Sequence, residues 1–172
     1  TKDAHFKSAF ELIDAGMHTV RSHQLMMLNG SEISTEKSRQ QYKMTTRFRV
    51  MPKTVDSYRI FEKDFITPEI DEICVSNSSM SFDDYLECRM FNLTIEVFYN
   101  NGIFQELLSL LKLYQISASS FIRKIHNKMC FSSNPLSGLY DDFLRETKEL
   151  WENKVALEKF LRQKGVIARY IS

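Results

Sequence analysis

The sequence has no excess of charge of either sign, which excludes several classes of partner. Its 172 residues include 23 lysines and arginines and 22 aspartates and glutamates, so the net charge at neutral pH is +1. Proteins that bind nucleic acids or anionic membrane surfaces usually carry a strong positive field over part of their surface. The charge balance therefore predicts no nucleic acid partner.

Cysteine is scarce, and long apolar runs are missing. Cys74, Cys88 and Cys130 are odd in number, widely spaced and part of no Cys-x2-Cys motif, so we expect free thiols in a reducing compartment rather than a disulfide framework. No apolar run approaches the roughly 20 residues of a membrane span, and the first residues lack the apolar core of a signal peptide. These absences predict a cytoplasmic protein without a membrane span.

The residues that are present suffice for a hydrophobic core, because 43% of them are hydrophobic and a chain of this length forms one ordinary domain or two small ones. In the N-terminal third we expect a helix over 5–15, a strand over 19–28, a helix over 34–42 and a strand over 45–51. This alternation is typical of α/β proteins. Because parallel strands need neighbours at both edges, residues 1–57 are predicted to be a slice of a partial parallel βα barrel.

The pattern changes after residue 57. Residues 58–80 contain short apolar pieces flanked by acids, which predict an irregular connector with one or two strands, in the second case an antiparallel pair joined by a turn at Pro68. From Ser81 the apolar spacing becomes helical, and we expect helices from there to the turn at 100–102 and over 103–114, 119–129 and 140–164. Residues 81–172 are thus predicted to form a C-terminal helical bundle, which makes the whole chain α+β.

The clearest candidate for a binding site is the turn that follows the apolar run QLMML at residues 24–28. The run ends in a turn signal, Asn29-Gly30-Ser31, and Glu32 follows before a helix-capable segment. In α/β proteins, ligands bind at the carboxyl ends of strands. Gly30 would let the backbone approach a ligand, and Glu32 could accept hydrogen bonds from a ribose or an amino group. An ordinary strand-to-helix loop, with an acid favoured by the helix dipole, explains the same pattern.

Two stretches of sequence carry a resemblance to a known family. Residues 15–32 read AGMHTVRSHQLMMLNGSE and residues 38–52 read SRQQYKMTTRFRVMP. They resemble the later part of the catalytic barrel of radical S-adenosylmethionine (SAM) enzymes, most closely the branch that also carries a cobalamin-binding domain. In those relatives a strand ending in Leu-Pro-Gly-x-Glu closes over the cofactor, and here residues 28–32 take its place with Asn29 where proline is usual.

Downstream, MSFDDY at 80–85, CRM at 88–90 and VFYNNG at 97–102 are similar to the helical region that follows the barrel in that branch. The resemblance thus covers residues 12–125. It implies a parent enzyme that uses SAM, a [4Fe-4S] cluster and cobalamin to perform radical chemistry, such as methylation of an unactivated carbon of a small-molecule substrate. It also implies that Gly30 and Glu32 contact the cofactor.

The signature of the family's cluster loop is absent from this chain. That loop is Cys-x3-Cys-x2-Cys, because one short segment must ligate three irons, whereas the three cysteines here are 14 and 42 positions apart. The chain also does not begin with methionine. We therefore expect it to be the C-terminal part of a longer protein, with the cluster loop and the cobalamin domain upstream, and to be inactive and free of cofactors by itself. The oligomeric state is left open.

Two arginines in the predicted strand over 45–51 are candidates for substrate binding. Arg47 and Arg49 alternate with apolar residues, so both project from one face of the strand. In a closed barrel that face would line the lumen, where an arginine could hold a carboxylate or a phosphate. A polar strand end that faces solvent explains the same alternation.

Two other functions remain open. The helices after Ser81 could form a noncatalytic protein-interaction module that binds a partner through an exposed apolar face. A small metal or thiol enzyme would need His126 and Cys130, which are four apart on a predicted helix, to meet a carboxylate. A packed histidine and a core cysteine are the preferred interpretation of that pair. Asp83, Asp84 and their neighbours at the start of a helix are interpreted as capping residues.

Overall fold

The computed structural model describes residues 1–51, 54–131 and 135–170, without the side chains of residues 130 and 131. The chain is a mixed α+β protein with two compact units. Unit 1 contains Thr1–His23 and Ser79–Lys148, and unit 2 contains Gln24–Ser78 and Glu149–Ser172. The sequence segments 1–57, 58–80 and 81–172 do not coincide with these units, because each unit combines an N-terminal with a C-terminal part of the chain.

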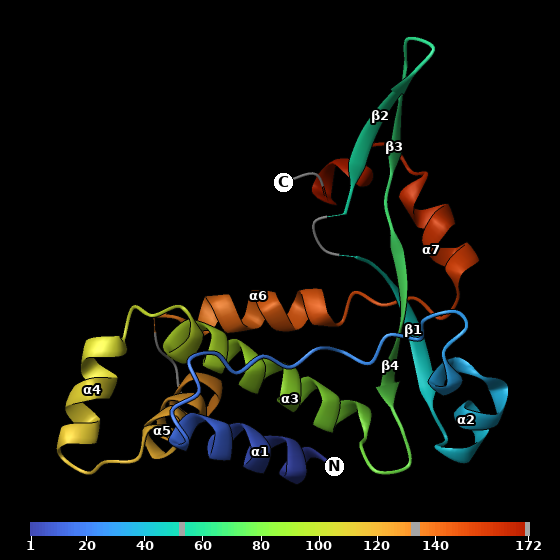
Figure 1. Cartoon of the computed structure of the whole chain (residues 1–172). Helices are drawn as coiled ribbons and strands as arrows, with labels where there is room; N and C mark the ends of the chain where they lie inside the picture. The colour runs from blue at the N-terminus through green and yellow to red at the C-terminus, as the bar shows by residue number, and fades with distance from the viewer. Residues whose placement is uncertain (52–53, 132–134, 171–172) are drawn as a thin grey trace. The chain divides into compact units, whose positions relative to one another are not determined.

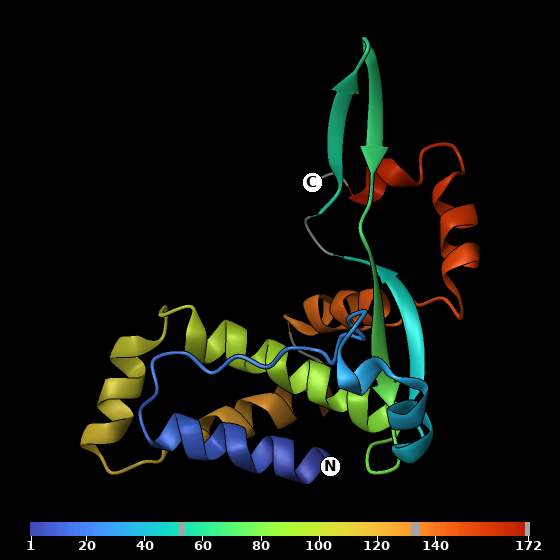
Figure 2. The same ribbon diagram turned by 45° about the vertical axis from the view of Figure 1, so that its right-hand side comes forward.

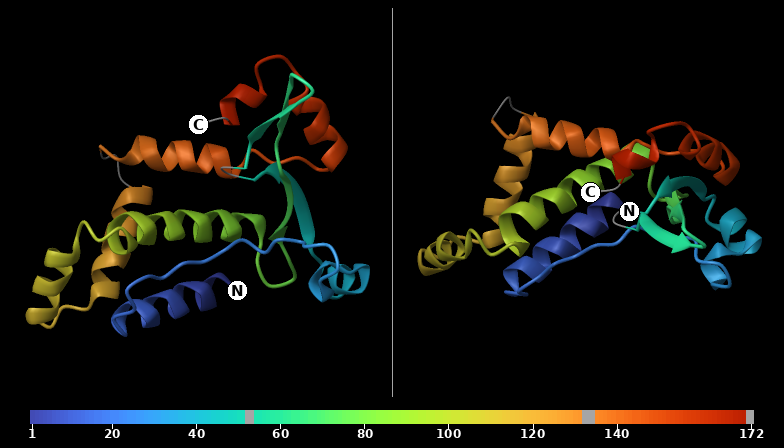
Figure 3. Two further views of the ribbon diagram at one scale, coloured as in Figure 1. Left: turned by 45° about the horizontal axis from the view of Figure 1, so that its top comes forward. Right: turned by 90° about the horizontal axis from the view of Figure 1, so that it is seen from above.

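Unit 1 consists of helices: α1 (Lys2–Asp14), α3 (Phe82–Ile95), η2 (Glu96–Asn100), α4 (Gln105–Leu113), α5 (Ala118–Phe131) and α6 (Ser137–Thr147). Figure 1 shows α1 beside α3, and Figure 3 shows α3 between α1 and α6. The core lies where α1, α3 and α5 meet, around the fully buried Phe91. Its ring stacks on Phe6 at 4.0 Å between centroids and meets Phe10 edge-on at 5.1 Å, so aromatic packing organises this unit.

The ends of the helices in unit 1 follow from their capping residues. The side chain of Ser81 accepts a hydrogen bond from the backbone of Asp84, whose carboxylate accepts one from the backbone of Ser81. This capping box confirms the role expected for the acids at the start of α3. Gly16 follows the cap residue Ala15 at the end of α1, and its φ of +76° is a conformation that side chains with a Cβ disfavour.

The π-helical turn η2 after α3 serves a structural purpose. A π turn rotates the residues that follow it relative to an α-helix, and here it presents Asn100 to the extended segment after α1. The Asn100 side chain accepts from the Val20 N–H at 2.9 Å and donates to the Val20 carbonyl at 3.0 Å. The side-chain amide of Asn100 thus satisfies both backbone groups of Val20, as a neighbouring strand would do in a sheet.

A buried polar network lies within the helices of unit 1. The Thr94 hydroxyl is 2.9 Å from His126 Nδ1 and 2.9 Å from the Tyr140 hydroxyl, and all three residues are buried. Burial lowers the pKa of His126 below its usual value of 6.5, because a charged imidazolium loses its hydration there. His126 is therefore a packed histidine, as preferred from the sequence. The side chain of Cys130 lies outside the described residues.

Unit 2 contains the strands. These are β1 (Thr45–Val50), β2 (Asp56–Ile60), β3 (Lys63–Thr67) and β4 (Ile70–Ser76), and they form two antiparallel pairs, β1 with β4 and β2 with β3. The unit also contains the short helices η1 (Glu32–Ser34), α2 (Glu36–Gln41), α7 (Lys154–Leu161) and η3 (Ile167–Tyr170). Figure 2 shows the β2–β3 hairpin as a ribbon separate from the β1–β4 pair. Its turn is at Phe61 and Glu62 rather than at Pro68, which precedes β4.

The strand expected over 19–28 is absent as a regular strand. Only its last residues pair: Met27 donates to the Glu72 carbonyl at 2.8 Å, and the Leu25 carbonyl accepts from Cys74 at 2.9 Å, around an antiparallel bridge between Met26 and Ile73. The parallel arrangement expected for residues 1–57 is not seen among the described residues, where every strand pair is antiparallel. The β2–β3 hairpin connects β1 to β4 and returns the chain in the opposite direction, so β4 pairs antiparallel with β1.

The long helix predicted over 140–164 is also wrong. It is divided into α6 and α7, and between them Trp151 pairs with Phe48 of β1, donating at 2.9 Å and accepting at 2.8 Å. Asn153 then caps α7 by accepting from Ala156. The apolar spacing continues across the break because α7 contributes Leu157 and Leu161 to the core of unit 2, around Val50.

Candidate functional site

The turn expected to bind a ligand begins where the edge segment, residues 24–28, leaves β4. The Ser31 backbone N–H and hydroxyl both donate to the Leu28 carbonyl, at 3.1 and 2.7 Å, which closes the turn. Gly30 has a φ of +85°, and a Cβ added there would meet nothing within 4 Å. The glycine is therefore required by the backbone conformation, and the space beside it is open.

Hydroxyl groups hold the residues that follow the turn. The Glu32 carbonyl accepts from the hydroxyls of Thr35 at 2.7 Å and Ser38 at 2.8 Å. Thr35 also caps α2 by accepting from the Ser38 backbone. The Glu32 carboxylate is exposed and, among the described residues, makes no hydrogen bond or ion pair. The backbone of Glu32 is thus fixed while its side chain can bind a group from outside.

The strongest electrostatic contact in unit 2 lies beside this turn. Arg39 of α2 binds both carboxylate oxygens of Glu72 on β4, with 2.9 Å between Nη2 and Oε2, and its Nε donates to the Ser34 carbonyl at 3.0 Å. Thr46 of β1 donates to the same carboxylate at 2.6 Å. The hydrogen bonds from Arg39 lower the pKa of Glu72 below 4.5, although burial opposes the shift. This bidentate pair ties the turn to the sheet.

The two arginines expected to bind substrate occupy alternate positions of β1 and have neighbours inside the unit. Arg49 Nη2 lies 3.4 Å from the buried carboxylate of Asp71, directly across on β4. Arg47 donates to the carbonyl of Thr46 at 2.9 Å. Arg49 Nε is buried and has no acceptor among the described residues. The Nε–H of Arg49 is thus a donor without an acceptor in the described part of the chain. A carboxylate or a phosphate oxygen is the kind of acceptor that it would bind.

The cysteines do not fit an iron–sulfur cluster. Cluster ligands are thiolates, but Cys74 and Cys88 are buried, and burial raises the pKa of both thiols, that of Cys88 to about 11. Both are therefore protonated at neutral pH. The described residues contain no group of three or more histidine, cysteine, aspartate or glutamate side chains that could hold a metal ion. His18 and His23, which are exposed in an extended segment, belong to no such group.

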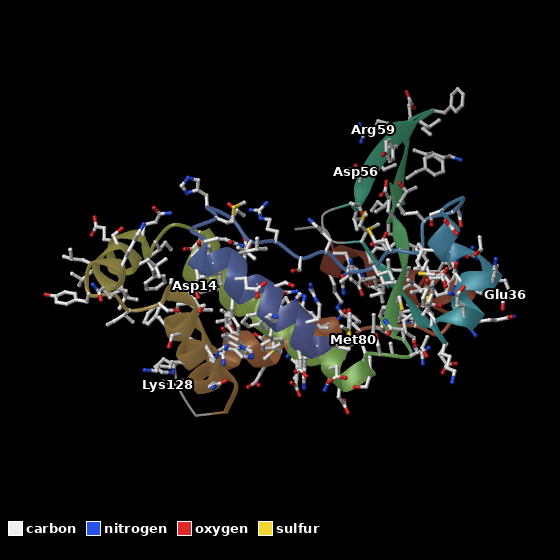
Figure 4. All side chains as sticks on the ribbon, turned by 60° about the horizontal axis from the view of Figure 1, so that its bottom comes forward. Asp14, Glu36, Asp56, Arg59, Met80 and Lys128 are labelled. Atoms are coloured by element: carbon white, nitrogen blue, oxygen red, sulfur yellow. The ribbon has the colours of Figure 1, made fainter. Side chains whose placement is uncertain are left out.

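Two clefts lie away from the turn. The larger, about 750 Å³, is in unit 1 between α1 and α5. Arg123 stacks over Phe10 at its wall, with 4.4 Å from Cζ to the ring centroid, and His126 borders it. Asp14, at one end of this cleft, accepts hydrogen bonds from Ser117 and Ser119. These hydrogen bonds lower the pKa of Asp14, although burial opposes the shift. Figure 4 labels Asp14 at the end of α1. The smaller cleft, about 320 Å³, is in unit 2 between Pro68 and α7.

The chain matches no model of a known protein family, and none of the curated proteins matches it significantly. None of the helices in the described ranges has the length and apolar character that crossing a membrane requires. The structure brings Gly30 and Glu32 together in one turn, but the substrate role of Arg47 and Arg49 and the cofactor role of the turn stay predictions.

Sequence reasoning missed Arg39, Glu72 and Thr46, which come from three elements. Arg39 and Glu72 are 33 positions apart, and no spacing rule relates them. A signal was available in part, because Glu72 interrupts the apolar alternation of a strand between Ile70 and Cys74. An acid in a half-buried strand requires a cationic or hydrogen-bonding partner.

Proposed function

We propose that this chain is the C-terminal part of a radical SAM enzyme that also uses cobalamin, and that the turn at residues 28–32 contacts SAM. The proposal rests on the resemblance of residues 12–125 to that family. It assigns the cluster loop and the cobalamin domain to regions outside this chain, because the described cysteines do not fit a cluster. It also assigns the protein to the cytoplasm, where thiols such as those of Cys74 and Cys88 stay reduced.

One structural observation supports the proposal: the backbone of residues 25–28 forms a sheet edge with a strand neighbour on one side only among the described residues. The backbone hydrogen bonds of Leu25 and Met27 run to β4, and among the described residues no strand pairs with the opposite edge. Leu25 and Leu28 are nevertheless large, apolar and exposed. An unpaired apolar edge is a template for another strand.

A barrel strand from elsewhere in the parent protein would satisfy that edge. β4 lies between the edge segment and β1 and is antiparallel to both, so the incoming strand would pair with the other edge of residues 25–28. The turn would then lie at the carboxyl end of a central strand, where α/β enzymes bind their ligands. Of the segments expected from the sequence, 1–57 would contribute residues 25–28 and β1 to this sheet, 58–80 would contribute β4 between them, and 81–172 would contribute the helical part.

The residues of the turn suit SAM in their donor set. The open backbone at Gly30 permits close approach, and the exposed carboxylate of Glu32 can accept from a ribose hydroxyl or an ammonium group. When bound and reductively cleaved, SAM would supply a 5′-deoxyadenosyl radical. The share of this chain is to orient the cofactor through Glu32, with Arg47 and Arg49 as the candidates for binding an acidic group of the substrate.

The experiment is to express the complete natural protein anaerobically, reconstitute it with iron and sulfide, and measure visible absorption and 5′-deoxyadenosine formation with dithionite. We expect a brown protein that cleaves SAM. Glu32→Gln should raise the KM for SAM about tenfold, as expected for the loss of one charge-assisted hydrogen bond, without changing the absorption of the cluster.

Glu36→Gln is the matched control. Glu36 is an exposed acid four residues away on α2, labelled in Figure 4, and its carboxylate accepts only a local hydrogen bond from Gln40. This variant should keep the wild-type KM. A natural protein that loads no cluster, or a Glu32→Gln variant with unchanged KM in an active enzyme, would overturn the assignment.

The alternative, a noncatalytic protein-interaction module, is favoured by α4. This helix has no buried residue, and the apolar side chains on and around it are exposed, up to 76% for Ile103 and Leu113. Such a module would also be favoured by a complete fold in residues 1–57, but β1 takes its partner strand from residues 70–76. Leu110→Asp separates the two functions: a module loses its partner, whereas SAM cleavage in an enzyme is unaffected.

A further inference from the structure

The β2–β3 hairpin has two different faces, and neither is buried by the described residues. All residues from Asp56 to Thr67 are exposed. The register places Tyr58 opposite Phe65 and Ile60 opposite Lys63, and because side chains alternate along strands, these four share one face. The exposed fractions of Tyr58, Ile60 and Phe65 are 53%, 51% and 47%.

The opposite face carries Ser57, Arg59, Asp64 and Ile66, and its two charged side chains are paired within the hairpin. Arg59 lies across from Asp64 and binds its carboxylate in a bidentate manner, at 2.8 Å from Nε and 3.1 Å from Nη2. Figure 4 shows Asp56 and Arg59 on the same strand of the hairpin. The hairpin is therefore amphipathic, but its apolar face has no cover. Since an isolated two-stranded hairpin is marginally stable in water, such a face is expected to pack against a partner.

The charges on the apolar face indicate what that partner is. Asp56 lies at the base of the face and Lys63 at its tip beside Ile60, with Tyr58 and Phe65 between the two charges. Among the described residues, neither charged side chain makes an ion pair within the chain, in contrast to Arg59 and Asp64. Glu62 belongs to the turn, with a φ of +62°, and not to a strand face. The face thus has a negative end, an apolar middle and a positive end.

We propose that this face binds the same face of a second copy of the chain, through a two-fold axis perpendicular to the strands. This operation reverses the strand direction, so it brings Asp56 of one copy to the level of Lys63 of the other, twice per dimer. It also stacks the apolar residues at the centre. A self-complementary patch of this kind is what an isologous interface requires, and face-to-face packing of two hairpins is a normal sheet arrangement.

The size of the face sets the strength of the association. Three half-exposed apolar side chains per copy cannot reach the roughly 1,600 Å² of a standard interface. The dimer is therefore weak and exchanges with monomers, with a dissociation constant of about 10 μM or higher. The interaction depends neither on SAM nor on the turn at Gly30, so it can fail or succeed independently of the proposed enzyme function.

Sedimentation velocity over a wide range of concentrations tests the dimer, and charge reversal tests its geometry. The wild-type protein should sediment faster as its concentration rises. Asp56→Lys and Lys63→Glu should each weaken self-association about tenfold at low salt, because attractive pairs become repulsive. These residues are exposed, so the variants should fold, which circular dichroism checks.

Mixing the two variants is the decisive measurement. A copy with Asp56→Lys has two positive ends and a copy with Lys63→Glu has two negative ends, so the mixture should associate as tightly as the wild type or more tightly. Ile66→Ser, on the opposite face, is the control that leaves association unchanged. A protein that stays monomeric, or a dimer insensitive to the two charge reversals, would overturn the proposal. If the hairpin amides are protected from hydrogen exchange while the protein is monomeric, another part of the same protein covers the face, and this result would also overturn the proposal.

Discussion

Units 1 and 2 are stabilised by different interactions. Unit 1 has a continuous core of aromatic and aliphatic side chains from α1, α3 and α5, centred on Phe91. Unit 2 has a smaller apolar core around Leu157, and its sheet and turn are joined by the Arg39–Glu72 pair. Its hairpin buries nothing among the described residues.

The difference indicates where function is located. The core of unit 1 is well packed, but α4 of the same unit leaves apolar side chains exposed. In unit 2, the free strand edge and the uncovered face of the hairpin leave groups for other molecules to satisfy. We therefore interpret the core of unit 1 as the support, and the sheet edge and hairpin of unit 2 as the surfaces that bind in the proposals above.

Removal of the central ring of unit 1 should have the largest effect. Phe91→Ala would leave a cavity among Phe6, Phe10 and His126 and should cost about 3–5 kcal/mol of unfolding free energy. Hydrogen exchange during denaturation should locate the loss in unit 1. Phe61→Ala, at a ring that is 95% exposed, should change stability by less than about 0.5 kcal/mol. Equal losses from both variants would contradict the account of the core.

Removal of the Glu72 charge should have the next largest effect. Glu72→Gln leaves Arg39 without its carboxylate, and we expect a loss of about 2 kcal/mol, below the value for a fully buried pair because both side chains are partly exposed. The pKa of Glu72 is lower in the folded state than its usual 4.5. Its contribution is therefore complete above pH 4.5 and is lost as the pH falls through the folded value.

The pH dependence of Glu72→Gln checks this sign. Wild type and variant should differ in unfolding free energy at pH 7 and converge on acidification below pH 4.5. Glu36→Gln, at an exposed acid at the start of α2, the helix that carries Arg39, should follow the wild type throughout. A difference that grows on acidification would show that the pair does not stabilise unit 2 as its charged form.

The buried network of unit 1 should respond less strongly and at a different pH. Thr94→Val removes the hydroxyl that contacts His126 and Tyr140 and should cost about 1–2 kcal/mol, whereas Thr94→Ser keeps the hydroxyl and should cost less. Because burial lowers the pKa of His126 below 6.5, the unfolded state binds this proton first. The stability of unit 1 should thus fall as the pH decreases below 6.5, which histidine NMR titration and urea unfolding can follow; equal losses for both Thr94 variants would contradict the role of the hydroxyl.

The smallest effect is expected at the turn. Gly30→Ala forces a Cβ into a φ of +85° although the space is open, so strain alone should cost about 1 kcal/mol. Gly138 is a matched control, because it lies in α6 with nothing within 4 Å of an added Cβ, and Gly138→Ala should stabilise by up to about 1 kcal/mol. Thermal unfolding of both variants checks the signs, and a neutral Gly30→Ala would contradict the strained turn.

The predictability of the fold from sequence follows the same division. In unit 1, α1, α3, α4 and α5 were expected near their observed places because apolar spacing and capping residues are local signals. In unit 2, β1 and α2 were expected, but strand partners were not, because pairing depends on residues far apart in the chain. Trp151, which pairs with Phe48 and divides α6 from α7, has no local signal of a strand.

The candidate site was predicted in part for the same reason. Gly30 and Glu32 follow from a turn signal that is contiguous in sequence. The carboxylate partners of Arg39 and Arg49, by contrast, come from β4, and only the antiparallel register of β1 and β4 brings them there. Resemblance to a family suggested a cofactor, but the parallel barrel inferred with it is not seen in the described residues.

The most direct test of the proposed SAM-contacting turn is the yield of 5′-deoxyadenosine from the complete natural protein, anaerobically reconstituted and reduced. The account predicts 5′-deoxyadenosine formation that requires iron, sulfide and dithionite and that Glu32→Gln slows at limiting SAM while Glu36→Gln does not. Absence of 5′-deoxyadenosine from a protein that folds and binds no cluster would contradict the claim.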